Sequence, residues 1–511
     1  MANTNQISDI SEEDTNNMWY STAMEQAQFG HFNYAVLTLG GVISATIAAP
    51  GSSLVEARDV ISCDLGMNRN NQVLFNKCTI IALIAGSLAV SIIADRFGRI
   101  VPLMVVLILY GIFTMALTFC THFISFTICS ILRAFGASAT FCILLVYVAE
   151  VQTPRYRGSG ICTIYMCWVL GSLIIPILNI NWGLAQFMFG LVAVLCAAVV
   201  PSVFLRSPRF LLSTGRNSEA WETFKIIFAL NTNEHQNEYS KKQLVDDSNI
   251  QLTNLHKLQL YIPKSLQPPW YCTVISLQTQ LVFNLCLFSM SWWFPEINVR
   301  HVLIFPSVFE SIGCANDKGP LRDKYFPAAL RVKEQQERLP ALETFCEIEK
   351  TDNYYYDEMM CIALTNLPFI VWMIIKIDSS GRSYFIILSH VIGGFMSFVV
   401  YFLINTPQSV LYTCIMESLL CVSRAAVSCL IMEFCHTKYR TLGIGMMYSL
   451  SYAGMLIGIR GWIIFEMNCV FIISILGILI TSTLKSGKKN NCKKNQFYFP
   501  IEYGRFNDFD K

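Results

Sequence analysis

Long uncharged apolar runs alternate with short polar segments along the 511-residue chain. A helix that crosses a bilayer needs about 20 mostly apolar residues, because the hydrocarbon core is about 30 Å thick and each residue rises about 1.5 Å. The runs therefore predict transmembrane helices, and the longest predict two helices joined by a tight turn near His122, Asn181 or Asn405. In chain order the runs are Ala27–Val55, Cys78–Ala94, Ile100–Leu132, Ala134–Ala149, Gly158–Leu205, Tyr271–Pro295, Met359–Ile375, Ser383–Met416, Thr441–Ile459 and Met467–Leu484. They predict an all-α integral membrane protein with about 12 spans.

The composition agrees with this fold class and excludes several others. Charged residues make up 14% of the chain, against about 25% in soluble domains. A net charge of +2 gives no reason to expect a nucleic acid as partner. The sequence has no phosphate-binding loop, dinucleotide motif or metal-spaced set of Cys and His, so we expect no cofactor, no metal and no enzymatic activity. Most of the 19 cysteines lie in apolar runs, while Cys314–Cys346 is a candidate loop disulfide.

Basic residues indicate which side of the membrane is cytosolic. One side has short loops rich in Arg and Lys, whereas the tight turns near His122, Asn181 and Asn405 on the other side have none. The positive-inside rule then places both termini in the cytosol. The predicted organisation is a cytosolic N-terminal tail (1–28), a first six-helix half (29–205), a cytosolic linker with amphipathic helices (206–270), a second six-helix half (271–484) containing a long extracytosolic loop (296–357), and a cytosolic C-terminal tail (485–511).

A charge pattern occurs twice in the chain. Asp95–Arg99 follows the second span and Asp378–Arg382 follows the eighth, while Glu150 with Arg157 and Glu433 with Arg440 end the fourth and tenth spans. Every member of the second set lies 283 positions after its counterpart. Two motifs in register indicate an internal duplication, and two parallel six-helix halves form the major facilitator plan.

The repeated residues have the chemistry of a gate. Glycine allows the tight reversal of a short loop, aspartate can face the N-terminus of a neighbouring helix, and arginine can pair with glutamate. We expect these pairs to close the cytosolic side in one state and to separate in another, although the alternative is that the arginines only set the topology. The predicted gate residues are Asp95, Arg96, Gly98, Arg99, Glu150, Arg157, Asp378, Gly381, Arg382, Glu433 and Arg440.

Several strings resemble a known family. Asp95–Arg99, Tyr147–Val151 and Ser207–Leu212 resemble segments of organic-ion and sugar carriers of the major facilitator superfamily. With Glu219-Ala220-Trp221 and Trp293-Phe294-Pro295, the pattern is most similar to the synaptic vesicle glycoprotein 2 family. The resemblance covers about 29–230 and 270–484. It implies a major facilitator fold of 12 transmembrane helices in two six-helix halves.

The chain also departs from that family. The arginine that the family carries in the fourth span would fall at Ser130, and this chain has Arg133 one turn away. Arg206 stands where a glutamate usually precedes Ser-Pro-Arg, and Ser91 replaces the glycine that opens the first loop motif. These departures favour a divergent member.

Polar and aromatic residues within the spans are candidates for a solute cavity, because carrier sites lie near the bilayer midplane between the halves. Glu417 and Arg424 lie about two turns apart on one face of the tenth span, where they either bind solute or hold helices together. The family resemblance supports Trp168 and Trp293 as cavity residues. The alternatives are an interfacial aromatic belt and helix-bridging amides. The full candidate set is Trp168, Tyr165, Gln278, Asn284, Trp293, Glu417 and Arg424.

Two functions remain open from the sequence. The leading hypothesis is a secondary-active or facilitative transporter of a small organic solute, an organic ion or a sugar-like molecule, that works by alternating access. The alternative is a regulatory membrane protein of the synaptic vesicle glycoprotein 2 type that transports little. In either case we expect a monomer in the lipid bilayer of the plasma membrane or an intracellular vesicle.

Overall fold

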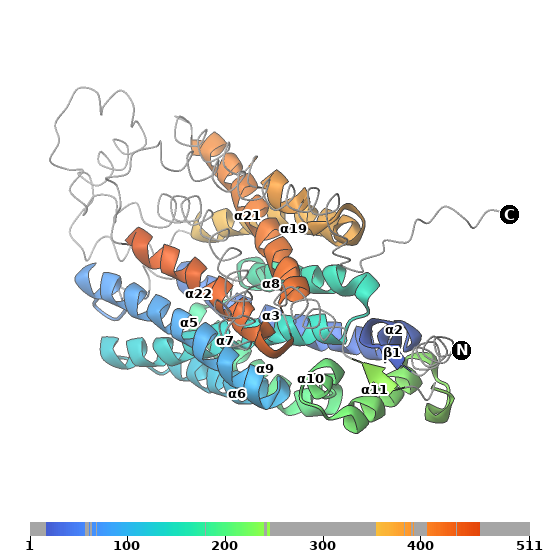
Figure 1. Cartoon of the computed structure of the whole chain (residues 1–511). Coiled ribbons are helices and arrows are strands. Elements are labelled where there is room, and N and C mark those ends of the chain that lie inside the picture. The colour runs from blue at the N-terminus through green and yellow to red at the C-terminus, as the bar shows by residue number, and fades with distance from the viewer. Residues whose placement is uncertain are drawn as a thin grey trace, which may run out of the picture.

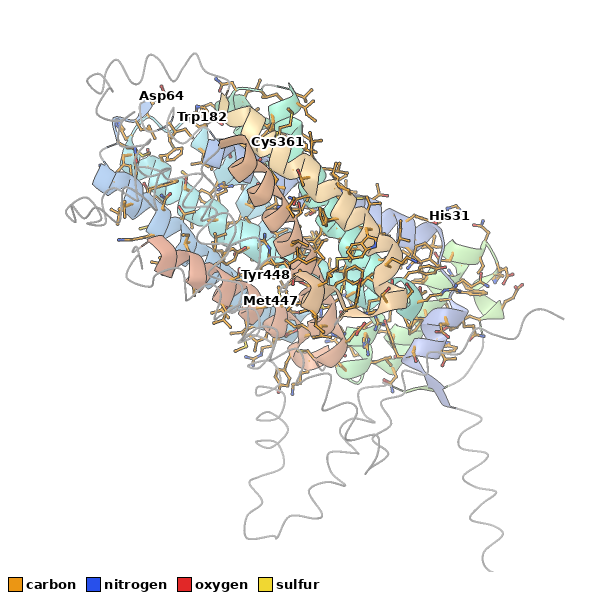
Figure 2. All side chains as sticks on the ribbon, turned by 90° about the horizontal axis from the view of Figure 1, so that it is seen from above. His31, Asp64, Trp182, Cys361, Met447 and Tyr448 are labelled. Atoms are coloured by element: carbon orange, nitrogen blue, oxygen red, sulfur yellow. The ribbon has the colours of Figure 1, made fainter. Side chains whose placement is uncertain are left out.

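The computed structural model describes residues 17–245, 354–392 and 406–459, with gaps at 57–60, 62–63, 68, 179, 240–242, 383, 390–391 and 436. Within these residues the chain forms a bundle of long helices with a smaller group of helices packed at one end (Figure 1). Figure 2 shows Asp64, Trp182 and Cys361 near one end of the bundle and His31 near the other. We call the end that carries His31 and Phe97 the gate end.

Six helices of the first half are long and apolar enough to cross a membrane. They are α3 (His31–Glu56), α5 (Arg69–Phe97), α6 (Ile100–Leu117), α7 (Phe123–Val151), α8 (Arg157–Leu178) and α9 (Trp182–Val203). The structure therefore divides the long apolar runs at the predicted turns near His122 and Asn181. Helix α5 begins before Cys78, earlier than the predicted run. Helix α7 continues across Arg133, as expected if Ala134–Ala149 completes the fourth span that begins after His122.

Three long helices of the second half are described. They are α19 (Tyr354–Ser380), α21 (Thr406–Phe434) and α22 (Arg440–Ile459). The predicted seventh and last spans, Tyr271–Pro295 and Met467–Leu484, lie outside the described residues, as does the Cys314–Cys346 pair. Most of the predicted ninth span lies there too.

The two halves contact one another through two helix pairs. Helix α5 of the first half packs against α22 of the second, and α8 of the first packs against α19 of the second. The 283-residue offset converts one pair into the other, because α5 corresponds to α19 and α8 corresponds to α22. The sequence duplication is thus visible as a two-fold relation at the interface between the halves.

The linker folds back onto the gate end of the first half. It contains α10 (Pro208–Ser213), α11 (Asn217–Thr232) and β2 (Gln243–Val245), and β2 pairs in parallel with β1 (Asn17–Trp19) next to α2 (Tyr20–Gln26). Tyr239 donates a hydrogen bond to the Ala23 carbonyl at 2.8 Å. Burial raises the pKa of Tyr239 well above its usual value, so this hydroxyl remains a donor. The N-terminal segment and the linker therefore form one packed unit.

Candidate functional site: a gate between the two halves

Each copy of the loop motif reverses the chain through a glycine. Gly98 has φ +96° and Gly381 has φ +85°, a left-handed conformation that glycine adopts without strain. The reversal directs the following arginine back toward the aspartate four residues earlier. Arg99 Nη2 lies 3.4 Å from Asp95 Oδ1, and in the second copy Arg382 Nη2 lies 2.9 Å from Asp378.

Both aspartates cap a helix of the opposite half. Asp95 accepts hydrogen bonds from the backbone N–H groups of Thr441 at 3.2 Å and Leu442 at 2.8 Å, at the start of α22. Asp378 accepts one from the N–H of Ser159 at 2.9 Å, at the start of α8. A carboxylate at this position satisfies free N–H groups and meets the positive end of the helix dipole. Each cap therefore joins the two halves.

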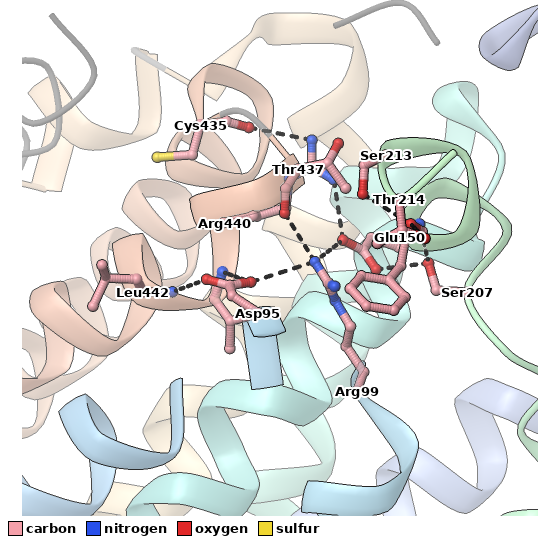
Figure 3. A network of polar contacts seen from close by, with 12 residues as sticks. Asp95, Arg99, Glu150, Ser207, Ser213, Thr214, Cys435, Thr437, Arg440 and Leu442 are labelled. Carbon is pink, nitrogen blue, oxygen red and sulfur yellow. Dashed lines mark hydrogen bonds and ion pairs between the residues drawn. The ribbon is translucent and has the colours of Figure 1, made fainter. Parts of the chain in front are cut away.

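Glu150 is the centre of the first copy (Figure 3). Its side chain is fully buried and accepts hydrogen bonds from Arg99 at 2.9 Å, from Arg440 of the second half at 3.3 Å, and from Ser207 of the linker at 2.7 Å. Arg99 also donates to the Thr437 carbonyl at 2.9 Å, across the interface. Charged hydrogen bonds in a buried site are stronger than those in water. This cluster therefore ties three segments together.

The second copy of the motif has fewer contacts around its glutamate, Glu433, in the described chain. Arg382 lies 2.7 Å from Glu433, whose side chain is 24% exposed. Arg157, the counterpart of Arg440, donates through Nε to the Ala149 carbonyl at 3.0 Å, while its charge acts on Glu433 at longer range. Arg96 is exposed and lies outside the network. Of the predicted gate residues, the side chains of both aspartates, both glutamates, Arg99, Arg382 and Arg440 are brought together.

Two glycines allow the halves to approach closely. A Cβ at Gly158 would collide with Asp378 Oδ1, and a Cβ at Gly445 would collide with Ser87 O and Ser91 Oγ. Both clashes involve atoms of the opposite half. The halves therefore approach closely at both glycines, with a backbone contact at Gly445, in addition to the charged contacts.

A group of aromatic side chains lies between the halves, further from the gate end. The Tyr165 hydroxyl lies 2.8 Å from Ser428 Oγ and contacts the Tyr448 hydroxyl. The Phe141 ring centroid lies 4.7 Å from that of Trp168 and 5.5 Å from that of Tyr165. Figure 2 labels Tyr448 within the bundle. We call Phe141, Tyr165, Trp168, Ser428 and Tyr448 the interface cluster.

Two of the seven predicted cavity residues, Tyr165 and Trp168, belong to the interface cluster. Arg424 is half-buried one turn before Ser428 on α21, and its charge acts on Tyr165. Glu417 lies on α21, but its side chain is not among the described ones. Gln278, Asn284 and Trp293 lie outside the described residues.

Sequence reasoning missed several contacts of these sites. In the sequence Ser207 stands out only as part of a family string, and Thr437 has no distinguishing signal. Tyr20, whose hydroxyl donates to the Glu150 carbonyl at 2.6 Å, gave no signal because it precedes the first span. A signal did exist for Tyr448, because it lies 283 residues after Tyr165.

These features define a class of protein: a polytopic helical membrane protein with two repeated halves that meet at a network of charged residues. A family model described as Major Facilitator Superfamily matches residues 64–325. The chain therefore belongs to the Major Facilitator Superfamily.

Curated relatives support the resemblance to the synaptic vesicle glycoprotein 2 family. Synaptic vesicle glycoprotein 2C of Mus musculus is 24% identical over 235 residues, which cover 42% of this chain and 32% of that protein. Synaptic vesicle glycoprotein 2A of Rattus norvegicus is 25% identical over 236 residues, with 42% and 31% covered. The matched region thus spans about a third of the length of these relatives.

Solved structures support the fold. The proton:xylose symporter XylE bound to 6-bromo-6-deoxy-D-glucose aligns with a TM-score of 0.62 at 14% identity, covering 89% of this chain and 95% of that one. The human organic anion transporter MFSD10 aligns with a TM-score of 0.54 at 13% identity, covering 88% and 99%. The predicted major facilitator fold is confirmed.

Proposed function

We propose that this protein is a carrier that moves a small organic solute across a membrane by alternating access. The observation that carries the proposal is the repeated gate. Carboxylates of each half cap helices of the other half, and Arg440 reaches across the interface to Glu150. A rigid-body movement of one half against the other would break all of these contacts together, which is what a rocking carrier requires.

The solute site of this proposal lies at the interface cluster. Aromatic rings there offer flat apolar surfaces, and hydroxyl groups of Tyr165, Ser428 and Tyr448 offer hydrogen bonds. Rings and hydroxyls suit an organic ion or a sugar-like molecule. In this arrangement the gate end faces the cytosol, in keeping with the basic loops.

Uptake into proteoliposomes tests the proposal. The purified full chain would be reconstituted and offered a panel of labelled organic cations, organic anions and hexoses. We expect saturable uptake of at least one class, and we expect Trp168→Ala to lower it by about tenfold through loss of about 1.4 kcal/mol of ring contacts.

Trp182→Ala is the matched control. Trp182 is also half-buried in the first half but packs on Phe126 at the opposite end, with ring centroids 6.3 Å apart. It should leave uptake within twofold of the wild type, about 0.4 kcal/mol. No uptake of any solute by a correctly folded protein would instead favour a regulatory membrane protein, the alternative supported by the similarity to synaptic vesicle glycoproteins 2A and 2C.

A further inference from the structure

An arginine in the middle of the first half has no carboxylate partner among the residues that the structure describes. Arg133 follows the start of α7 at Phe123 by ten residues, so it lies about 15 Å along the helix, about half of the hydrocarbon thickness. Its side chain is only 8% exposed. Arg133 is therefore buried near the bilayer midplane.

The partner that the structure gives Arg133 is neutral. The guanidinium is hydrogen-bonded to the phenol of Tyr110 on α6, and this phenol donates its own hydrogen to the Thr46 carbonyl on α3 at 3.1 Å. Besides Glu150, the carboxylates of α3, α5, α6 and α7 are Glu56 at the far end of α3 and Asp95 at the gate end of α5. In the part of the chain that the structure describes, no ion pair involves Arg133, and its Nε has no hydrogen-bond partner.

A second unsatisfied donor lies one turn away. Ser130 is fully buried, and among the described residues its Oγ has no hydrogen-bond partner. Residues three apart on a helix lie on the same face, so the Ser130 hydroxyl and the Arg133 guanidinium are neighbours. The Ser130 hydroxyl and the Nε of Arg133 are thus two adjacent buried donors without an acceptor among the described residues.

A cation in this position is costly unless a negative charge accompanies it. We propose that Arg133 and Ser130 form a binding site for one small anion inside the first half. The ligand is a halide or a carboxylate, which arrives either as a free inorganic ion or as the acidic group of a solute. Guanidinium and hydroxyl donors suit both.

Thermal unfolding of the detergent-purified full chain tests this site without requiring transport. Sodium chloride or sodium acetate would be titrated at constant ionic strength against the sodium salt of 2-(N-morpholino)ethanesulfonate, a bulky anion without a carboxylate. A ligand that binds only the folded state raises the melting temperature in a saturable manner, and we expect a rise of about 2–3 °C. A response to chloride alone identifies an inorganic ion, and a response to acetate alone identifies a carboxylate group.

Variants connect the response to the two residues. Arg133→Gln should abolish the rise, and Ser130→Ala should weaken the apparent affinity roughly 3- to 10-fold, as expected for one hydrogen bond. Arg155→Gln, at an exposed arginine, should behave as the wild type. If Arg133→Gln does not fold, Ser130→Ala still decides the question. Equal melting temperatures in all three salts, or an unchanged response in the Ser130 variant, would overturn the proposal.

Discussion

The two copies of the gate motif have the same residues but different surroundings. In the first copy Glu150 is fully buried and bonded to two arginines and a serine, whereas in the second copy Glu433 is 24% exposed and its one ion pair in the described chain is with Arg382. The difference arises from the linker, which continues from the first half and places Ser207 on Glu150. Duplication supplied two equal ion pairs, and the linker made one of them the centre of the closed gate.

The largest expected effect comes from neutralising the two glutamates separately. Glu150→Gln removes the only carboxylate bonded to Arg440 in the described chain and leaves Arg99 with its longer pair to Asp95, which should destabilise this arrangement by about 3–5 kcal/mol. Glu433→Gln breaks a single, partly exposed pair and should cost about 1 kcal/mol or less. Thermal unfolding would measure both. Equal losses would refute the asymmetry.

The alkylation rate of Cys435 is a second measure of the difference between Glu150 and Glu433. Its thiol is buried beside the gate, and burial raises the pKa of Cys435 to about 12. Little thiolate therefore forms at neutral pH while the gate is closed, and the thiolate is the form that reacts. Glu150→Gln should accelerate alkylation of Cys435, measured by peptide mass spectrometry, more than Glu433→Gln does.

The hydrogen bond that the linker donates to Glu150 can be removed without changing the charged residues. Ser207→Ala deletes a hydrogen bond to a buried carboxylate and should lower stability by about 1.5–3 kcal/mol. Ser213→Ala is the matched control, because Ser213 lies on the same short helix but donates to the Phe210 carbonyl at 2.8 Å. It should change the free energy of unfolding by less than about 0.5 kcal/mol. If both variants behave alike, the linker does not distinguish the two copies.

The two aspartate caps, Asp95 and Asp378, should differ less in their contributions to stability than the two glutamates do. Asp95→Ala removes two hydrogen bonds from the start of α22, and Asp378→Ala removes one from the start of α8. Losses of about 0.5–2 kcal/mol are usual for helix caps, with the larger expected for Asp95. Asn caps as well as Asp does, so Asp95→Asn separates capping from charge: retention of most of the stability would show that capping dominates.

The smallest effect is expected at the tyrosine pair. Tyr165→Phe removes a hydroxyl that contacts both Ser428 and Tyr448, while Tyr448→Phe removes only one side of that contact. Each should cost about 0.5–1.5 kcal/mol in thermal unfolding, with Tyr165→Phe the larger. The reverse order would show that the two halves of the interface cluster are not arranged as described.

The overall fold could be predicted from the sequence more accurately than the residues at which individual helices begin and end. Apolar runs report where a helix lies in lipid, not where its hydrogen bonds stop. Helix α5 begins at Arg69 rather than near Cys78, since polar residues such as Asn71 and Lys77 continue the helix beyond the apolar run. The same reason accounts for α19, which begins at Tyr354 and ends at Ser380.

The pairing of Arg with Glu in each copy could be anticipated from the repeat, but the difference between the copies could not. The two motifs have the same spacing, so nothing in them distinguishes Glu150 from Glu433. What distinguishes them is Ser207, which is 57 residues from Glu150 in the chain, together with Arg440, which bonds Glu150 while its counterpart Arg157 donates to the Ala149 carbonyl. Tertiary contacts of this kind have no local signature. The offset of 283 also relates Tyr165 to Tyr448, so the repeat extends beyond the charged residues.

The close contacts at Gly158 and Gly445 set a limit on the size of these two residues. A single methyl group at either position would collide with the opposite half in this structure, and the proposed separation of the halves would remove the collision. At Gly158 the methyl group would also displace the Asp378 carboxylate, whereas at Gly445 it would meet Ser87 O and Ser91 Oγ. Gly445 is therefore a position where one added carbon atom would favour separated halves without touching any charge.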